Sequence, residues 1–311
     1  MSPMRSPSIV PMNNLPRRVR IWEVGPRDGL QNEASIIDTG TKIEFVNRLS
    51  DSGLPVIEAT SFVRADRIPQ LADGTEVMAG ISRRSGTRYP VLVPNMKGLD
   101  AALAADAHDI AVFASATETF AERNLGRSLS NQMDMFAPVL DRARLDHIPV
   151  RGYVSMCFGD PWEGFVDPAK VVDVCVELVE RGCSDVSLGD TIGVATPGQV
   201  QKLINMLVLA RINVDRIGVH FHDTYGQALS NTLAALQSGV STVDASAGGI
   251  GGCPYALSAT GNLATEDLVW MLEGLGVETG VDLEKLTATS LWLANYLGRP
   301  VQSRVGQALT H

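Results

Sequence analysis

Eight short apolar runs alternate with segments of helical pattern along almost the whole chain. The runs occupy residues 20–24, 55–60, 89–94, 109–115, 150–156, 185–190, 216–222 and 242–247. Repeated strand–helix units predict parallel strands, because right-handed crossovers bring consecutive strands into one sheet. Eight such units predict an α/β fold, the (β/α)8 TIM barrel. An open doubly wound sheet is the alternative, and it is disfavoured because no Gly-rich phosphate-binding turn follows the first run.

The segments between the runs have recognisable helix boundaries. Residues 167–182 place apolar side chains at helical intervals and stop at Gly182. Residues 196–212 begin with Thr-Pro, a capping residue followed by one suited to the first helical turn. Beyond the eighth unit, residues 282–300 predict a C-terminal helical segment appended to the barrel.

Length and charge limit the domain organisation and the partners. The chain has 311 residues and a net charge of −9, which favours neither nucleic acid nor an anionic membrane surface, so an anionic substrate would need a local basic pocket. No run approaches the ~18 apolar residues of a membrane span. Residues 1–19, rich in Pro and Ser, are expected to form a disordered arm, and residues 20–311 a single domain.

The cysteines indicate a reducing compartment. The four cysteines lack metal-type CxxC pairing, and no apolar signal core stands near the start of the sequence. We therefore expect reduced thiols and a cytoplasmic protein. We also expect a homodimer or a higher homo-oligomer, with neither nucleic acid nor membrane as partner.

Two of the five histidines, His220 and His222, stand two residues apart in the seventh run. Side chains at i and i+2 of a strand point to the same side, here the lumen of the barrel. Two imidazoles on one face can bind one divalent cation, or they can be hydrogen-bonded structural histidines. Asp28 and Asn262 could add oxygen ligands from distant loops. A mixed nitrogen and oxygen set with open positions suits Mg²⁺ or Mn²⁺.

Charged residues follow or interrupt other runs. Arg27 and Asp28 come directly after the first run and a Pro turn, where barrel enzymes place catalytic groups. Arg27 is a planar donor suited to a carbonyl or enolate oxygen, and the alternative is a solvated surface pair. Glu58 interrupts the second run and Asp190 ends the sixth. Each is either a catalytic carboxylate or a buried structural partner of a barrel cation.

The loop after the eighth run is rich in glycine, which gives its backbone unusual freedom. Cys253 at the end of this loop is either an inert thiol or a nucleophile or proton donor. Asn262, a few residues later, precedes a predicted helix, so its alternative to metal binding is an N-cap. The sequence contains no P-loop and no Ser–His–Asp elbow.

Four stretches taken together resemble one enzyme family. They are GPRDGLQNE, SLGDTIGVATPG, VHFHDTYGQALSN and GGIGGCPYALSATGNLATEDLVWML. The chain resembles the 3-hydroxy-3-methylglutaryl-CoA lyase family, which belongs to a larger group of metal-dependent TIM-barrel lyases and aldol-type synthases. The likeness runs from about Arg20 to the C-terminus. HxH alone would identify only the larger group, whereas HxHDTYGQA and GGCPY are specific to the lyase branch.

The resemblance implies a metal-dependent carbon–carbon lyase that cleaves the acyl-CoA substrate 3-hydroxy-3-methylglutaryl-CoA into acetyl-CoA and acetoacetate, a reaction of leucine degradation. It implies metal ligation by Asp28, His220, His222 and Asn262. It further implies that Arg27 stabilises the enolate of the departing acetyl-CoA and that Cys253 takes part in proton transfer to this enolate. Finally, it implies that Glu58 and Asp190 line the site and that Gln31 lies near the substrate. Either Asp28 or His220 could act as the general base.

Several loop positions depart from the family pattern. They are Ala34 after QNE, Arg64 and Asp66 in SFVRADRIPQ, and Leu257 and Ser258 in YALSATGN. These loops border the expected acyl and CoA site, so citramalyl-CoA or a longer branched glutaryl-CoA is an alternative substrate. An aldol-type synthase is disfavoured because the chain ends soon after the barrel. A non-catalytic metal- or CoA-binding barrel would be expected to lose Arg27, Asp28 or Cys253.

Overall fold

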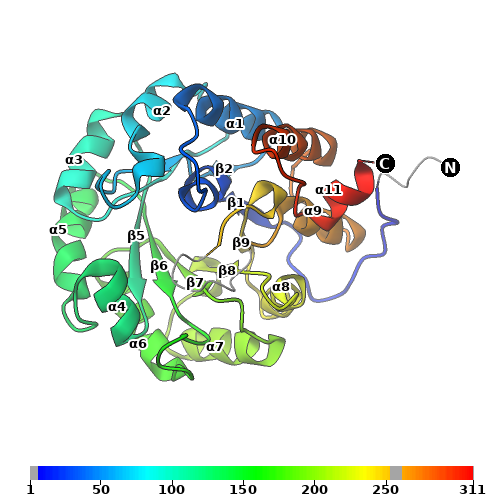
Figure 1. Cartoon of the computed structure of the whole chain (residues 1–311). Helices are drawn as coiled ribbons and strands as arrows, with labels where there is room; N and C mark the ends of the chain where they lie inside the picture. The colour runs from blue at the N-terminus through cyan, green and yellow to red at the C-terminus, as the bar shows by residue number, and fades with distance from the viewer. Residues whose placement is uncertain (1–5, 253–260, 311) are drawn as a thin grey trace.

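A computed structural model describes residues 6–252 and 261–310. Its parallel strands are β1 (Arg20–Glu23), β2 (Val56–Ile57), β3 (Thr60–Ser61), β4 (Val91–Leu92), β5 (Ile110–Ser115), β6 (Val150–Ser155), β7 (Asp185–Asp190), β8 (Ile217–Phe221) and β9 (Thr242–Ala245). All eight predicted runs form strands, and the second run forms two short ones. The strands lie at the centre of the molecule, and the helices surround them (Figure 1).

The sheet closes through the second run. β2 and β3 stand at the two ends of the strand order β2-β1-β9-β8-β7-β6-β5-β4-β3, although only Glu58 and Ala59 separate them in the chain. The Glu58 amide donates to the Glu23 carbonyl at 2.8 Å, and the Ala59 amide donates to the Pro90 carbonyl at 3.0 Å. One extended segment therefore pairs with β1 on one side and with β4 on the other. The prediction of a closed eight-strand barrel is confirmed.

The helices alternate with the strands as predicted. They are α1 (Thr39–Asp51), α2 (Gly74–Gly80), α3 (Met96–Ala104), α4 (Glu118–Leu125), α5 (Gln132–Leu145), α6 (Pro168–Glu180), α7 (Pro197–Leu209), α8 (Ala228–Gln237), α9 (Thr265–Gly274), α10 (Leu283–Tyr296) and α11 (Arg304–Leu309). Asp167 caps α6 by accepting from the Ala169 amide at 3.0 Å. None of the described helices has the length and apolar character needed to cross a membrane.

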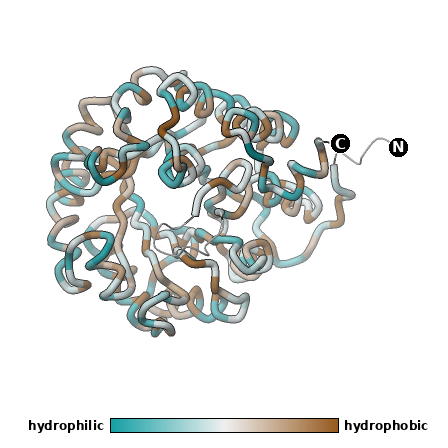
Figure 2. Tube along the Cα trace, in the orientation of Figure 1, coloured by the Kyte–Doolittle hydropathy of each residue, from teal (hydrophilic) through white to brown (hydrophobic). Residues whose placement is uncertain are grey.

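The core fills the space between the helices and the barrel. Phe45 of α1, Phe136 of α5 and Leu207 of α7 are fully buried and belong to one continuous apolar cluster with the strands. Apolar and hydrophilic stretches alternate along the outer helices, as expected for helices that bury one face (Figure 2). The predicted C-terminal helical segment is α10, which packs against α1: Arg48 lies over the Trp292 ring at 4.7 Å.

The N-terminal segment differs from the expected disordered arm. The Val10 amide donates to the Gly274 carbonyl at 2.9 Å, and the Val19 amide donates to the Glu278 carbonyl at 2.9 Å. Pro11 also packs against Gly276, at the end of α9. From residue 6 onward the segment therefore lies along the C-terminal part of the barrel. Its Pro and Ser content lowers its propensity for regular structure, but these backbone contacts hold it in place.

Candidate active site

Arg27 and Asp28 lie on a short π-helical turn, η1 (Gly25–Gly29), directly after β1. The amides of Arg27, Asp28 and Gly29 all donate to the Val24 carbonyl, which turns the chain sharply over the end of the strand. Arg27 Nη1 donates to Asp28 Oδ1 at 2.7 Å. The Arg27 residue is only 6% exposed, so this is a buried pair at the mouth of the barrel and not a solvated surface pair.

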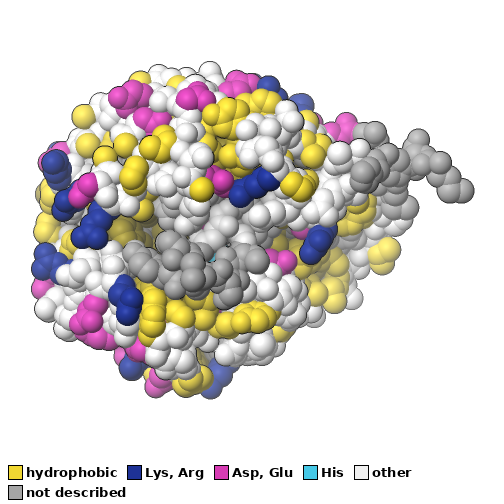
Figure 3. Space-filling view, in the orientation of Figure 1, with side chains coloured by type: hydrophobic (Ala, Val, Ile, Leu, Met, Phe, Trp, Pro, Cys, Tyr) yellow, Lys and Arg dark blue, Asp and Glu magenta, His cyan; other side chains and the backbone are white. Residues whose placement is uncertain are grey.

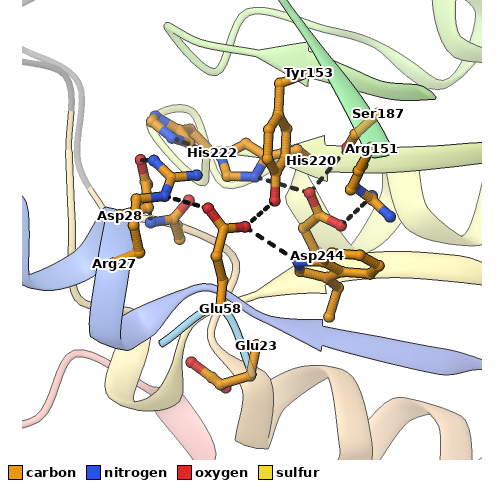
Figure 4. A network of polar contacts seen from close by, with 12 residues as sticks. Glu23, Arg27, Asp28, Glu58, Arg151, Tyr153, Ser187, His220, His222 and Asp244 are labelled. Atoms are coloured by element: carbon orange, nitrogen blue, oxygen red, sulfur yellow. Dashed lines mark hydrogen bonds and ion pairs between the residues drawn. The ribbon is translucent and has the colours of Figure 1, made fainter. Parts of the chain in front are cut away.

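His220 and His222 project into the barrel from the end of β8, as the strand period predicts (Figure 4). Their Nε2 atoms lie 3.3 Å apart. One ligand atom each from Asp28, His220 and His222 lies within 4.8 Å of the others. Two ligands at right angles on an octahedral cation, with bonds of about 2.1 Å, stand about 3 Å apart. The spacing of the two imidazoles therefore fits neighbouring positions on one divalent cation.

Asn262 completes this cluster from the far end of the chain. Its Nδ2 donates to Asp28 Oδ2 at 2.8 Å and to the Ile250 carbonyl at 3.0 Å. Its Oδ1 is buried and has no hydrogen-bond partner among the described residues. A buried acceptor without a partner is costly unless something binds it. Asn262 also forms a backbone β-bridge with His222. Because its side chain contacts Asp28 and its Oδ1 has no other partner in the described part of the chain, Asn262 is a candidate fourth ligand beside the two imidazoles and Asp28.

Burial and the neighbouring charges determine the protonation of these groups. Burial and His220 together lower the pKa of His222 to about 4, so His222 is a neutral imidazole at pH 7. Burial opposes the charged form of His220, yet Asp244 and Asp28 raise its pKa above the usual value. Burial also favours neutral Asp28, but Arg27 and the histidines lower its pKa. An ionised Asp28 beside a neutral imidazole is a suitable ligand pair for a cation.

Glu58 contacts Arg27 and not the histidine cluster. Its Oε1 accepts from Arg27 Nε at 2.6 Å. Its Oε2 accepts from Trp22 Nε1 at 3.1 Å and from the Tyr153 hydroxyl (Figure 4). Of the two interpretations open at the sequence level, this geometry is that of a buried partner for a barrel arginine. Because Nε donates to Glu58 and Nη1 donates to Asp28, two hydrogen bonds fix the orientation of the Arg27 guanidinium.

Asp190 stabilises a loop at the barrel mouth. Its two oxygens accept from the amides of Val194 at 2.9 Å and Ala195 at 3.1 Å, which secures the turn before α7. Burial raises the pKa of Asp190 to about 7 although these amides lower it. Gln31 lies half-buried one turn after Asp28. Cys253 lies outside the described residues.

Sequence reasoning missed several buried polar residues that support this cluster: Glu23, Arg151, Tyr153, Ser187, Asp244 and Glu266. Arg151 and Asp244 are charged residues inside apolar strands, the same signal that singled out Glu58. Glu23 ends β1 and accepts from the amides of Gly25 at 2.8 Å and Ala247 at 2.9 Å. It thereby ties the arginine-bearing turn to the loop after β9.

A closed parallel barrel with an acidic residue and two histidines that could hold a metal ion at the carboxyl ends of its strands is typical of metal-dependent TIM-barrel enzymes. The HMGL-like family model matches residues 18–292. A chicken (Gallus gallus) relative named "Hydroxymethylglutaryl-CoA lyase, mitochondrial" is 52% identical over 94% of this chain and 98% of its own. The chain therefore belongs to the HMGL-like family.

Solved structures agree with this assignment. Hydroxymethylglutaryl-CoA lyase from Pseudomonas aeruginosa superposes with a TM-score of 0.93 at 47% identity, covering 96% of this chain and 99% of its own. An HMG-CoA lyase from "Acenitobacter baumannii", solved in complex with coenzyme A and 3-methylmalate, gives a TM-score of 0.90 at 36% identity, covering 96% and 97%. The chain is a carbon–carbon lyase of this family.

Proposed function

We propose that this protein cleaves 3-hydroxy-3-methylglutaryl-CoA into acetyl-CoA and acetoacetate with one Mg²⁺ or Mn²⁺. The observation that supports the proposal most is the convergence of Asp28, His220, His222 and Asn262 beside Arg27 at the barrel mouth. A family relationship alone would support the fold and the reaction class. This cluster adds four side chains that could bind a cation, directly beside the buried Arg27 guanidinium.

The reaction removes a proton from the substrate, breaks a carbon–carbon bond and then adds a proton to one product. The substrate has a tertiary hydroxyl β to the thioester carbonyl. When a base takes the hydroxyl proton, the oxygen electrons form the ketone of acetoacetate. The adjoining carbon–carbon bond breaks, and its electron pair becomes the enolate of acetyl-CoA. A cation held by Asp28, His220, His222 and Asn262 would supply Lewis-acid stabilisation of the developing alkoxide. Asp28 and His220 both lie in the cluster, but a His220 ring that binds the cation through Nε2 and donates from Nδ1 to Asp244 has no lone pair left for the proton. We therefore assign the base to Asp28.

We assign stabilisation of the enolate to Arg27. Glu58 and Asp28 fix Nε and Nη1, and among the described residues no hydrogen-bond partner is found for Nη2. A preorganised donor aimed at a developing negative charge requires no reorganisation during the reaction. Glu58 then acts as a positioning residue, because it holds the guanidinium through Nε. Proton delivery to the enolate carbon remains assigned to Cys253 by family resemblance.

Basic side chains around the barrel mouth support an acyl-CoA substrate. Lys and Arg side chains gather on the part of this face near α3, α4 and α5 (Figure 3). Exposed Arg67 follows β3, Lys97 lies in the first turn of α3 after β4, and Arg123 and Arg127 lie in and just after the last turn of α4. Arg64 is also exposed but is paired with Asp66. On a chain with a net charge of −9, this local surface offers partners for the phosphates of CoA.

Substrate choice can be tested directly. Purified enzyme with Mg²⁺ is incubated with 3-hydroxy-3-methylglutaryl-CoA, citramalyl-CoA and a longer branched glutaryl-CoA, and kcat/KM is measured from acetyl-CoA release. We expect the first thioester to be preferred. A higher kcat/KM for either of the other two thioesters would show that the loops altered at Ala34, Arg64 and Asp66 select a different substrate. No cleavage of any thioester would refute the lyase proposal.

The compartment and the assembly state are also part of the proposal. Cys157, Cys175 and Cys183 are buried free thiols, which suits the reducing cytoplasm. Val208 and Leu209 leave apolar surface exposed at the end of α7, which a second copy could cover. Cell fractionation tests the first point. Light scattering of the purified protein tests the second, and a monomer at all concentrations would contradict it.

A further inference from the structure

Asp244 lies directly beside His220 in the barrel wall. The two residues are Cα partners in the parallel pairing of β8 with β9, and both side chains point into the lumen (Figure 4). His220 Nδ1 and Asp244 Oδ2 are 3.2 Å apart. Because Asp244 is 1% exposed, this contact is shielded from bulk solvent. The register of two neighbouring strands therefore fixes which imidazole nitrogen faces the carboxylate.

The rest of the Asp244 carboxylate is held by other donors. Arg151 Nη2 donates to Oδ1 at 2.6 Å, and the Ser187 hydroxyl donates to Oδ2 at 2.9 Å. Arg151, also 1% exposed, lies over the Trp22 ring at 4.1 Å. A Cβ on Gly218 would collide with the Arg151 guanidinium, so this glycine leaves the space that the arginine occupies. The carboxylate can therefore neither rotate nor move away from His220.

This arrangement selects one form of the imidazole. A carboxylate only accepts hydrogen bonds, so His220 must donate from Nδ1. In the neutral ring the lone pair then belongs to Nε2, the atom that lies 3.3 Å from His222 Nε2 and inside the cluster with Asp28. The opposite tautomer would place a proton at the position where a cation must bind, so the tautomer decides whether this ring can be a metal ligand.

We propose that Asp244 is a positioning residue that sets the tautomer and orientation of His220 for metal binding. Arg151 and Ser187 hold the Asp244 carboxylate in place. The inference rests on the proposed metal site. The competing explanation is that Asp244 serves only as the buried counterion of Arg151 and stabilises the interior of the barrel. The two explanations differ in what they predict for the affinity of the metal site.

Asp244→Asn separates the two explanations. The Asn oxygen must satisfy Arg151, so its amide nitrogen turns toward Ser187 and His220 and donates to Nδ1. The proton of His220 then moves to Nε2. We expect the Kd for Mn²⁺, measured by electron paramagnetic resonance of the free ion, to rise tenfold to a hundredfold, the range usual for loss of such a partner. Wild-type affinity in a folded Asp244→Asn protein would overturn the proposal.

Asp185→Asn is the matched control. Asp185 accepts from Arg151 Nη1 at 3.0 Å but does not contact His220. We expect this variant to lose thermal stability while keeping the Kd for Mn²⁺ within about twofold. Equal losses of Mn²⁺ affinity in the two variants would show that Asp244 acts only through the structural pair with Arg151, and would also overturn the proposal.

A measurement on the unchanged protein covers the case in which Asp244→Asn fails to fold. Nitrogen-15 NMR of the histidine rings in the metal-free wild-type protein at pH 8 reports which nitrogen of His220 bears the proton. We expect the proton on Nδ1, and a proton on Nε2 would overturn the proposal. Neither readout involves a substrate. A wild-type protein that binds Mn²⁺ but cleaves no thioester would therefore refute the proposed function alone.

Discussion

Replacement of Arg27 by Gln should reduce kcat strongly while leaving the fold intact. The guanidinium is the buried cation nearest the metal cluster, held by Glu58 at 2.6 Å and by Asp28 at 2.7 Å. Loss of one preorganised charge-assisted contact to a developing oxyanion costs about 3 kcal/mol, which corresponds to a decrease of about a hundredfold or more in kcat. The assay is acetyl-CoA release at saturating substrate, with Mg²⁺ present.

The surrounding contacts explain why the variant should fold. Without Arg27, Glu58 still accepts from Trp22 and Tyr153, and Asp28 still accepts from Asn262. Each carboxylate keeps a donor on one oxygen, but Glu58 Oε1 loses its donor and this buried carboxylate loses its counterion. We therefore expect the wild-type circular dichroism spectrum together with a lower melting temperature. Arg181→Gln is the control, since Arg181 forms only an exposed pair with Glu177 on α6. A near-normal kcat for Arg27→Gln would refute a role in stabilising the enolate.

Three further results are expected. Exhaustive chelation should abolish activity and added Mg²⁺ or Mn²⁺ should restore it; full activity in metal-free enzyme would contradict the metal proposal. Glu58→Gln should lower kcat about tenfold by loosening Arg27 without changing the Kd for Mn²⁺, because Glu58 contacts Arg27 and not the histidines; an unchanged kcat would remove its positioning role. Burial raises the pKa of Glu266 from 4.5 to about 7, so the folded state retains a proton that the unfolded state loses, and the free energy of unfolding should fall as the pH rises through this window. In urea titrations, the decrease in unfolding free energy with rising pH should be about 3 kcal/mol smaller for Glu266→Gln than for the wild type, since each pKa unit is worth about 1.4 kcal/mol. The same pH dependence in both proteins would contradict this prediction.

The strand positions and the cluster of Asp28, His220 and His222 could be predicted because each depends on a local pattern. Apolar runs of strand length gave the eight strands, and the two-residue period placed His220 and His222 on one face. The carboxyl-end rule then placed Asp28 beside them. Asn262 had a stronger local interpretation as a helix cap, and only the structure shows that its Nδ2 contacts Asp28 and that its buried Oδ1 has no partner among the described residues.

The supporting contacts could not be predicted, because they depend on strand register and barrel closure. Asp244 meets His220 only because β8 and β9 pair in the observed register. Tyr153 meets Glu58 across the lumen, and no spacing in the sequence encodes that contact. The π-helical turn that aims Arg27 inward also lacks a sequence signal beyond its glycines and proline. Long-range packing decides such features.

The most direct test of the central claim is the stoichiometry of the two products. Purified enzyme with Mg²⁺ is mixed with 3-hydroxy-3-methylglutaryl-CoA, and acetyl-CoA and acetoacetate are quantified over time. Cleavage of the carbon–carbon bond at the cluster of Asp28, His220 and His222 predicts that the two products appear in equal amounts, only when the cation is present. Release of free CoA without acetoacetate, or equal product formation in the presence of excess chelator, would contradict the account.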